Sequence, residues 1–285
     1  MDFQIMQDME TVMELRNLTK DEFAKELGVS RTTVCNWIAG KKDISEKNIS
    51  MFYEYTFNKG IRLNKIKEQL YREDLERNTE FLLFHGAKTR IEGGLRLDCS
   101  KRKNDFGAGF YCGESLEQSA MFVSTFPSSS LYMLKFNSIG LNCKEFAVNR
   151  EWMLMIAYFR ERLGDYADSE MIAALQRELV GVDYIVAPIA DNRMFEIIDQ
   201  FIDGEITDVQ CQHCLSATNL GNQYVFISER GLKQVEILER CYLTAAEKES
   251  YLVSRQESYE INKDKVRVAR KQYRAQGNYI EDILK

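Results

Sequence analysis

One glycine-rich stretch constrains the fold of this chain more than any other: Asn104-Asp105-Phe106-Gly107-Ala108-Gly109-Phe110-Tyr111-Cys112-Gly113. Its glycines allow tight turns and let the backbone approach a ligand with no Cβ atom in the way. Phe110 and Tyr111 follow the second glycine, and neighbouring side chains on a strand point to opposite faces. We therefore expect Phe110 to face a core and Tyr111 to present its ring to a flat, charged ligand.

The composition is that of a folded protein. The chain has 285 residues, 45% of them hydrophobic and 11% aromatic, which suffices for one large domain and one small domain. We find no apolar run of about 18 residues and no signal-peptide pattern, and we expect neither membrane insertion nor secretion. The seven cysteines, an odd number, then indicate reduced thiols in the cytoplasm.

The net charge of −6 restricts how the chain can meet nucleic acid. No long part is strongly basic, so such a contact must come from a local patch. One patch lies in the C-terminal tail, where residues 263–274 hold six basic residues and one acid. It predicts contact with nucleic acid or an acidic partner, or else a solvated helix packed by Val266, Val268 and Tyr273.

The N-terminal residues read as a small all-α domain. Thr19 and Glu22 form a capping box at the start of one helix, and Gly28 ends that helix. Ser30 can cap the next helix, which runs to about Ala39. A helix, a short turn with glycine and a capped helix make a helix-turn-helix.

The stretch LTKDEFAKELGVSRTTVCNWIAGKKDIS, residues 18–45, resembles the Xre/lambda-repressor-like helix-turn-helix family. The resemblance covers about residues 8–58 and implies a recognition helix facing a DNA major groove, with two lysines near phosphate. The residues concerned are Arg31, Thr32, Thr33, Asn36, Lys41 and Lys42. Modules of this kind also dock proteins or form dimers, so a protein partner or a homodimer is the alternative.

We divide the chain into a helix-turn-helix domain at 1–58, a connecting helix at 59–78, a large domain at 79–238 and a helical basic tail at 239–285. The large domain mixes short strands with helices, which predicts an α+β fold. We expect strands at 81–84, 131–136, 182–188 and 223–227, and helices at 115–123, 145–163 and 208–217.

Three polar residues occupy three separate elements of the large domain. His85 with Gly86 closes an apolar strand, Tyr111 follows the glycine stretch, and Gln223 begins the late run QYVF. Their order and types resemble the ADP-ribosyltransferase fold of the diphtheria toxin and poly-ADP-ribose polymerase branch, which carries a His, a Tyr and a Glu. The resemblance is closer still to uncharacterised bacterial ADP-ribosyltransferase-like domains with DFGxGFY, APIADNRMF and QYVF motifs, over about residues 80–240. It implies a split β-sheet.

The resemblance also implies NAD as cofactor and cleavage of its nicotinamide–ribose bond through an oxocarbenium-like transition state. In that case His85 hydrogen-bonds one ribose, Tyr111 stacks on the nicotinamide, and Gln223 holds the 2′-hydroxyl of the reacting sugar. The residues expected to bind NAD are His85, Gly86, Lys88, Phe106, Gly107, Gly109 and Tyr111.

Gln223 departs from the pattern of the branch, which usually has Glu at this place. A charge-assisted hydrogen bond is roughly twice as strong as a neutral one. Gln223 can still orient the sugar hydroxyl but brings no negative charge. We therefore expect mono-ADP-ribosylation or NAD hydrolysis and no chain elongation.

Two further groups leave alternatives open. Asp191, Asn192 and Arg193 interrupt apolar sequence and either line the acceptor side of the site or cap the following helix. Cys211 and Cys214 share one helix face, but structural zinc needs four ligands, usually in two pairs. We expect no metal, and buried apolar cysteines instead.

The sequence thus predicts an intracellular bacterial NAD-dependent mono-ADP-ribosyltransferase that modifies a nucleic acid or a protein. A role as a toxin or a phage-defence effector follows by analogy only. The alternative is a DNA-binding transcriptional regulator whose large domain binds NAD or ADP-ribose without turnover.

Overall fold

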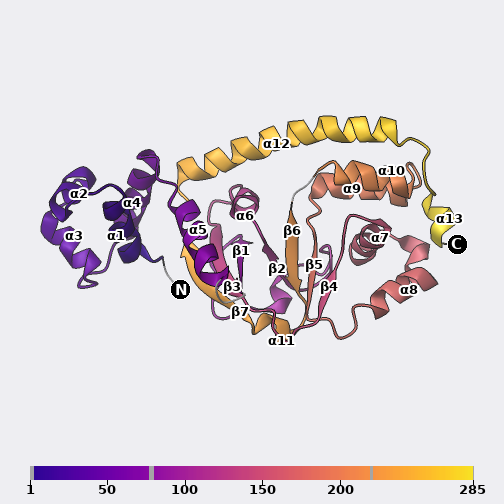
Figure 1. Cartoon of the computed structure of the whole chain (residues 1–285), viewed down its shortest axis with the longest axis horizontal. Helices are drawn as coiled ribbons and strands as arrows, with labels where there is room; N and C mark the ends of the chain where they lie inside the picture. Colours follow the sequence, from indigo (N-terminus) through magenta and orange to yellow (C-terminus); the bar gives the residue numbers. More distant parts are fainter. Residues whose placement is uncertain (1–2, 77–79, 219–220, 285) are drawn as a thin grey trace. The chain divides into compact units, whose positions relative to one another are not determined.

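The computed structural model of this protein describes residues 3–76, 80–218 and 221–284. It is an α+β chain (Figure 1). Its residues divide into two compact units. The first unit comprises Met1–Arg90, Ser119–Lys135 and Ile237–Val253, and the second comprises Ile91–Gln118, Phe136–Glu236 and Ser254–Lys285. Each unit is thus built from segments that are distant in sequence.

The first unit begins with helices and continues into strands. Its helices are α1 (Ile5–Leu15), α2 (Lys20–Leu27), α3 (Arg31–Ile38), α4 (Glu46–Asn58) and α5 (Leu63–Glu76). Its strands are β1 (Phe81–Ala87), β3 (Ser130–Phe136) and β7 (Val235–Cys241), hydrogen-bonded in the order β1-β3-β7.

The N-terminal helices confirm the predicted signals. Thr19 and Glu22 form the reciprocal capping box of α2, and Gly28 ends that helix with φ of +70°. Ser30 accepts a hydrogen bond from the backbone N–H of Thr33 at the start of α3. The core between these helices contains Phe23, Val34, Trp37 and Phe52, none more than 2% exposed.

A buried ionic cluster fastens the N-terminal helices to the strands of the first unit. Lys67 Nζ of α5 lies 2.8 Å from Asp8 Oδ1 of α1 and 2.5 Å from Glu239 Oε2 of β7. Tyr53 of α4 donates its hydroxyl proton to Asp8 Oδ2 at 2.6 Å. Burial raises the pKa of Glu239. Because one lysine compensates two buried carboxylates, these elements form one packed body.

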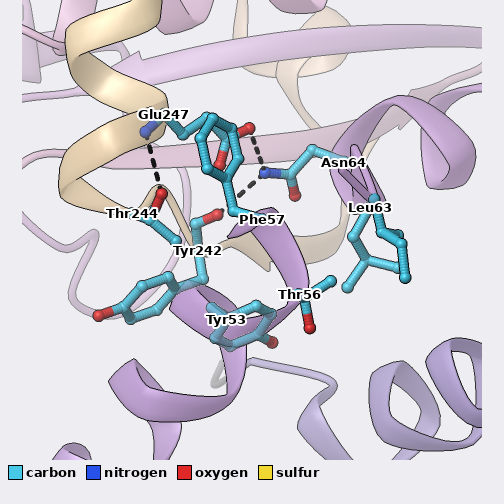
Figure 2. A pocket seen from close by; sticks show the side chains of 9 residues that line it. Tyr53, Thr56, Phe57, Leu63, Asn64, Tyr242, Thr244 and Glu247 are labelled. Atoms are coloured by element: carbon cyan, nitrogen blue, oxygen red, sulfur yellow. Dashed lines mark hydrogen bonds between the residues drawn. The ribbon is translucent and has the colours of Figure 1, made fainter. Parts of the chain in front are cut away.

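Figure 2 shows a second polar junction of the first unit, around a small cavity. Asn64 Nδ2 donates to Tyr242 O at 2.9 Å and to Glu247 Oε1 at 3.2 Å. The rings of Tyr53 and Tyr242 stack with centroids 4.5 Å apart. The cavity measures about 10 Å³, room for about one water molecule, so this junction is packing and not a ligand site.

The second unit combines strands with a helical layer. Its elements are β2 (Phe110–Gly113), β4 (Cys143–Glu145), α7 (Arg150–Phe159), α8 (Glu170–Arg177), β5 (Tyr184–Pro188), α9 (Asn192–Ile202), α10 (Asp208–Ser216), β6 (Asn222–Phe226), α11 (Glu229–Leu232) and α13 (Ile280–Leu284). The strands run in the order β4-β5-β6-β2. β4 and β5 are parallel, and β6 is antiparallel to both β5 and β2.

Two helices belong to both units. They are α6 (Leu116–Val123) and the long α12 (Ala245–Gln272). The tail after α12 docks on the second unit, where the backbone N–H of Asn278 donates to Asp208 Oδ1 at 2.8 Å, and Ile280 and Leu284 are buried.

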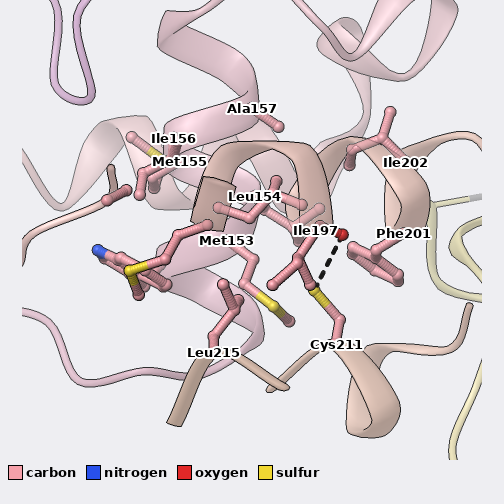
Figure 3. Close-up of a cluster of buried hydrophobic side chains, with 14 of the residues drawn as sticks. Met153, Leu154, Met155, Ile156, Ala157, Ile197, Phe201, Ile202, Cys211 and Leu215 are labelled. Carbon is pink, nitrogen blue, oxygen red and sulfur yellow. Dashed lines mark hydrogen bonds between the residues drawn. The ribbon is translucent and has the colours of Figure 1, made fainter. Parts of the chain in front are cut away.

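The core of the second unit lies among α7, α9 and α10 (Figure 3). Every residue of α7 from Trp152 to Ala157 is fully buried, so this helix is apolar all round. Cys211 and Cys214 are buried here, as predicted, and Cys211 Sγ contacts Ile197 O at 3.6 Å. Among the described residues no group of His, Cys, Asp and Glu could hold a metal ion.

One boundary and one side-chain contact differ from the sequence-based expectations. The predicted junction at 238/239 falls inside β7, a strand that we did not predict. The junction at 78/79 lies outside the described residues. Of the tail residues expected to pack, Val266 is buried and Tyr273 partly buried, but Val268 is 60% exposed. No helix of the described residues has the length and apolarity that a membrane crossing requires.

Candidate functional site

The glycine turn that precedes β2 serves the packing of the chain itself. Gly107 has φ of +74°, and a Cβ there would lie 3.0 Å from the ring of Phe159. A Cβ on Gly109 would lie 2.7 Å from the carbonyl oxygen of Phe226 on β6. The sequence analysis explained these glycines by the close approach of a ligand. The close approach of neighbouring elements is a second explanation for the same glycines.

Tyr111 is held by the loop that leads to it. Its hydroxyl donates to Gly107 O at 2.7 Å and accepts from the backbone N–H of Phe106 at 3.1 Å. Burial raises the pKa of this phenol, so it stays a proton donor. Phe110 is 5% exposed and faces the core, as expected. The ring of Tyr111 is partly buried and fixed in orientation.

Gln223 lies on the same sheet face as Tyr111. In the antiparallel register of β2 and β6, Tyr111 opposes Val225 and Gly113 opposes Gln223. Residues two apart on a strand share a face, so Gln223 and Tyr111 are diagonal neighbours. Sequence and register together bring these two predicted residues to one place.

A buried carboxylate that the sequence analysis did not single out fixes Gln223. Gln223 Nε2 donates to Asp105 Oδ2 at 2.9 Å and to Pro188 O at 3.2 Å. Asp105 Oδ1 accepts from Arg160 Nε at 3.0 Å, and the Arg160 guanidinium lies 4.1 Å from the ring centroid of Phe195. Asp105 and Gln223 are 6% and 7% exposed. No local signal marks this pair, because its members are 118 residues apart.

This arrangement decides which end of the Gln223 amide is available. Both neighbours of Nε2, the Asp105 carboxylate and the Pro188 carbonyl, are acceptors, so the NH₂ group must face them. Oε1 is left as an acceptor for a donor such as a hydroxyl. The Asp105–Arg160 pair presents its negative member to Gln223, which increases the polarity of that amide.

The other residues expected to bind NAD are placed differently. Phe106 is 2% exposed and stacks on Phe146 with centroids 5.3 Å apart, so its ring belongs to the core and its expected ligand contact is wrong. His85, Gly86 and Lys88 lie in the first unit, on or just after β1.

Each of these three residues has a described neighbour in the first unit. The ring centroid of His85 lies 6.4 Å from that of Tyr132. A Cβ on Gly86 would lie 2.6 Å from Val123 Cγ1, so this glycine lets α6 approach β1. Lys88 Nζ lies 4.8 Å from the ring centroid of Phe126. Their part in an NAD site stays a prediction.

Of the two roles predicted for residues 191–193, a helix cap or the acceptor side of the site, the structure shows the helix cap. Asp191 caps α9, with Oδ1 accepting from the backbone N–H of Met194 at 2.8 Å. Asn192 is exposed at the first position of the helix. Arg193 donates to Tyr259 O of α12 at 3.0 Å. Contact with an acceptor molecule stays a prediction.

The expected DNA-reading residues lie on and after α3. Arg31, Thr32, Lys41 and Lys42 are exposed, and Thr33 and Asn36 are partly buried. Arg31 Nε lies 3.3 Å from Asp21 Oδ2, with both side chains largely in solvent. The Thr33 hydroxyl is 2.8 Å from Ser30 Oγ, so it contributes to the cap of α3. α3 therefore presents basic and hydroxyl groups at its N-terminal end, as a recognition helix does.

Comparison with known families covers most of the chain. A family model described as a protein of unknown function, DUF3990, matches residues 81–237. The chain belongs to this family. His85, Asp105, Tyr111 and Gln223 all lie within the DUF3990 match.

A second model, described as a helix-turn-helix, matches residues 9–51. It confirms the predicted helix-turn-helix and supports DNA binding by this part. No curated protein matches the chain. No solved structure matches it either.

Proposed function

We propose that this DUF3990 protein is an NAD-dependent mono-ADP-ribosyltransferase whose helix-turn-helix directs it to DNA. One observation carries the proposal: Gln223 Oε1 is left as an acceptor, fixed by Asp105, on the sheet face of Tyr111. An acceptor oxygen at this place is what a ribose hydroxyl requires, and a glutamate would offer the same kind of atom. The sequence resemblance supports the same roles.

The residues offer groups that a nicotinamide riboside can use. The partly buried, immobilised ring of Tyr111 suits a flat cation. The Asp105 carboxylate behind Gln223 orients and polarises the Gln223 amide, and Arg160 pairs with that carboxylate. A ribose contact by His85, which lies in the first unit, stays a prediction from the resemblance alone. When bound, NAD would supply its ADP-ribosyl group: the anomeric carbon exchanges its bond to the nicotinamide nitrogen for a bond to an acceptor oxygen or nitrogen, and the acceptor proton passes to solvent.

The test is release of nicotinamide from radiolabelled NAD by the full chain, with and without duplex DNA. We expect slow release by the wild type and at least 100-fold slower release by Gln223→Ala and Tyr111→Ala. Gln234→Ala, which removes an exposed glutamine of the second unit, is the matched control and should release at the wild-type rate. Circular dichroism confirms that each variant is folded.

Three outcomes would contradict the proposal. If NAD binds and neither the wild type nor any variant releases nicotinamide, the large domain is a sensor and not a transferase. If NAD does not bind in calorimetry at millimolar concentration, the site holds some other ligand. Retained release in Gln223→Ala would show that the acceptor oxygen is not needed.

A further inference from the structure

The C-terminal end of α12 lines a hollow in the second unit that is separate from the residues discussed above. Its volume is about 470 Å³, within the range of small-molecule pockets. It is lined from α9, the loop between α9 and α10, α10, the end of α12 and the segment that follows α12. The lining residues are Gln200, Glu205, Ile206, Gln210, Arg270, Lys271, Arg274, Ala275 and Tyr279.

The lining is basic in a chain that is acidic overall. Three cations, Arg270, Lys271 and Arg274, face one carboxylate, that of Glu205. Most other arginines of the second unit are already paired, as Arg150 is with Asp208 and Arg230 with Asp183. Among the described residues, Lys271 and Arg274 have no carboxylate within ion-pair distance. Their charges are therefore available to an anion.

The hydrogen-bond donors of Gln200 and Arg270 also suit an anion. Gln200 Oε1 accepts from Arg270 Nη2 at 2.5 Å, which leaves the Gln200 amide hydrogens free to donate. Arg270 Nε is buried and has no hydrogen-bond partner. A buried N–H without an acceptor is costly, so the Arg270 side chain keeps one donor that its own surroundings leave unsatisfied. Ala275 adopts φ of +59°, a conformation rare outside glycine, where the chain turns around the pocket.

We infer that this pocket binds a free phosphorylated small molecule of mononucleotide size. Phosphate offers several acceptor oxygens and up to two negative charges, which match two free cations and the donors of Arg270 and Gln200. The volume exceeds what phosphate alone needs, and the partly exposed ring of Tyr279 can contact an attached base. A nucleic-acid strand fits less well, because the next basic residue along the helix, Arg267, is already paired with Asp264.

The experiment is calorimetric titration of the full chain with AMP, inorganic phosphate, adenosine and a 20-base-pair DNA duplex. AMP should bind more tightly than inorganic phosphate, and adenosine should not bind. The double variant Lys271→Gln/Arg274→Gln should weaken AMP at least tenfold. The matched variant Lys263→Gln/Lys265→Gln removes two exposed charges of the same helix outside the pocket and should stay within twofold.

The variant Gln223→Ala separates this site from the proposed NAD site. If Gln223→Ala loses AMP binding and Lys271→Gln/Arg274→Gln keeps it, AMP binds at the NAD site and the inference is overturned. Equal AMP affinity in both double variants would overturn it too. If only the duplex responds to Lys271→Gln/Arg274→Gln, the cations serve nucleic acid. Failure of nicotinamide release would leave this inference intact, because no step of it uses Tyr111 or Gln223.

Discussion

Asp105 gives a physical reason for a glutamine at position 223. The two side chains are buried and lie 2.9 Å apart, with the amide as donor and the carboxylate as acceptor. A glutamate in place of Gln223 would set two carboxylates side by side at low dielectric, where both cannot stay ionised. The neutral residue at this position is therefore required by its neighbour.

We predict that Gln223→Glu lowers the free energy of unfolding by about 1–3 kcal/mol at pH 7.5, because a buried hydrogen bond becomes a repulsion. One carboxyl of the pair would then have a raised pKa in the folded state. The native state binds that proton more tightly than the unfolded state, so the missing stability should return as the pH falls towards 5. Urea unfolding at both pH values measures this.

The double variant Asp105→Asn/Gln223→Glu is the control, since it restores one carboxylate and one amide. It should recover part of the stability at pH 7.5. A wild-type unfolding midpoint for Gln223→Glu at pH 7.5 would show that the two side chains are not coupled.

At the scale of elements, the contact between β2 and β6 depends on a missing methyl group. We predict that Gly109→Ala destabilises the protein by about 1–3 kcal/mol, because the added Cβ would lie 2.7 Å from Phe226 O and 3.1 Å from Val225 Cγ1. Gly94→Ala is the matched control, since a Cβ there meets no atom within 4 Å. Thermal unfolding of both variants checks the difference, and an equal midpoint for the two would refute it.

The exposed basic residues of the helix-turn-helix lead to a prediction about DNA binding. If α3 and the turn after it bind DNA, Lys41→Ala/Lys42→Ala should weaken binding uniformly over sequences and lower the salt slope of log K by about 2, since each lysine would neutralise one phosphate. Arg31→Ala should cost about 1–3 kcal/mol on the preferred sequence and relax its specificity. The control is Lys233→Ala, which removes an exposed charge from the second unit. Fluorescence anisotropy at several salt concentrations gives the slopes.

Elements whose stabilising contacts lie within a few residues could be predicted from the sequence. Elements stabilised by residues far apart in the sequence could not. The caps Thr19 and Ser30 bond to backbone groups three residues away, and a sequence pattern records such bonds. β7 was not predicted. Its Glu239 is fully buried because Lys67, 172 residues earlier, compensates it, and no neighbouring residue indicates that pairing. Asp105 and Gln223 were missed as a pair for the same reason.

At the scale of the whole molecule, the helix-turn-helix is not an appendage on a flexible tether. Asp8, Lys67 and Glu239 join α1, α5 and β7 within one compact unit. The chain contains two tryptophans, Trp37 in the first unit and Trp152 in the second. Each can therefore report on its own part.

We predict that Lys67→Met destabilises the first unit by about 3–5 kcal/mol, because it leaves two buried carboxylates without a counter-charge. In a Trp152→Phe background only Trp37 emits. Its emission should show a lower urea midpoint with Lys67→Met than without it. Lys47→Met, an exposed lysine of α4, should change it by less than about 0.5 kcal/mol. A midpoint for Lys67→Met equal to that of Lys47→Met would mean that the ionic cluster contributes nothing.

The position of Lys67 also bears on how such a chain can be inherited. A recombination event that moved only residues 3–58, which contain the helix-turn-helix, to another gene would carry away Asp8 and Tyr53 and leave Lys67 and Glu239 behind. Both products would then contain buried charged residues whose ion-pair or hydrogen-bond partners are missing. Natural descendants should therefore exchange the DNA-reading part together with α5 and β7, or change positions 8, 67 and 239 in concert.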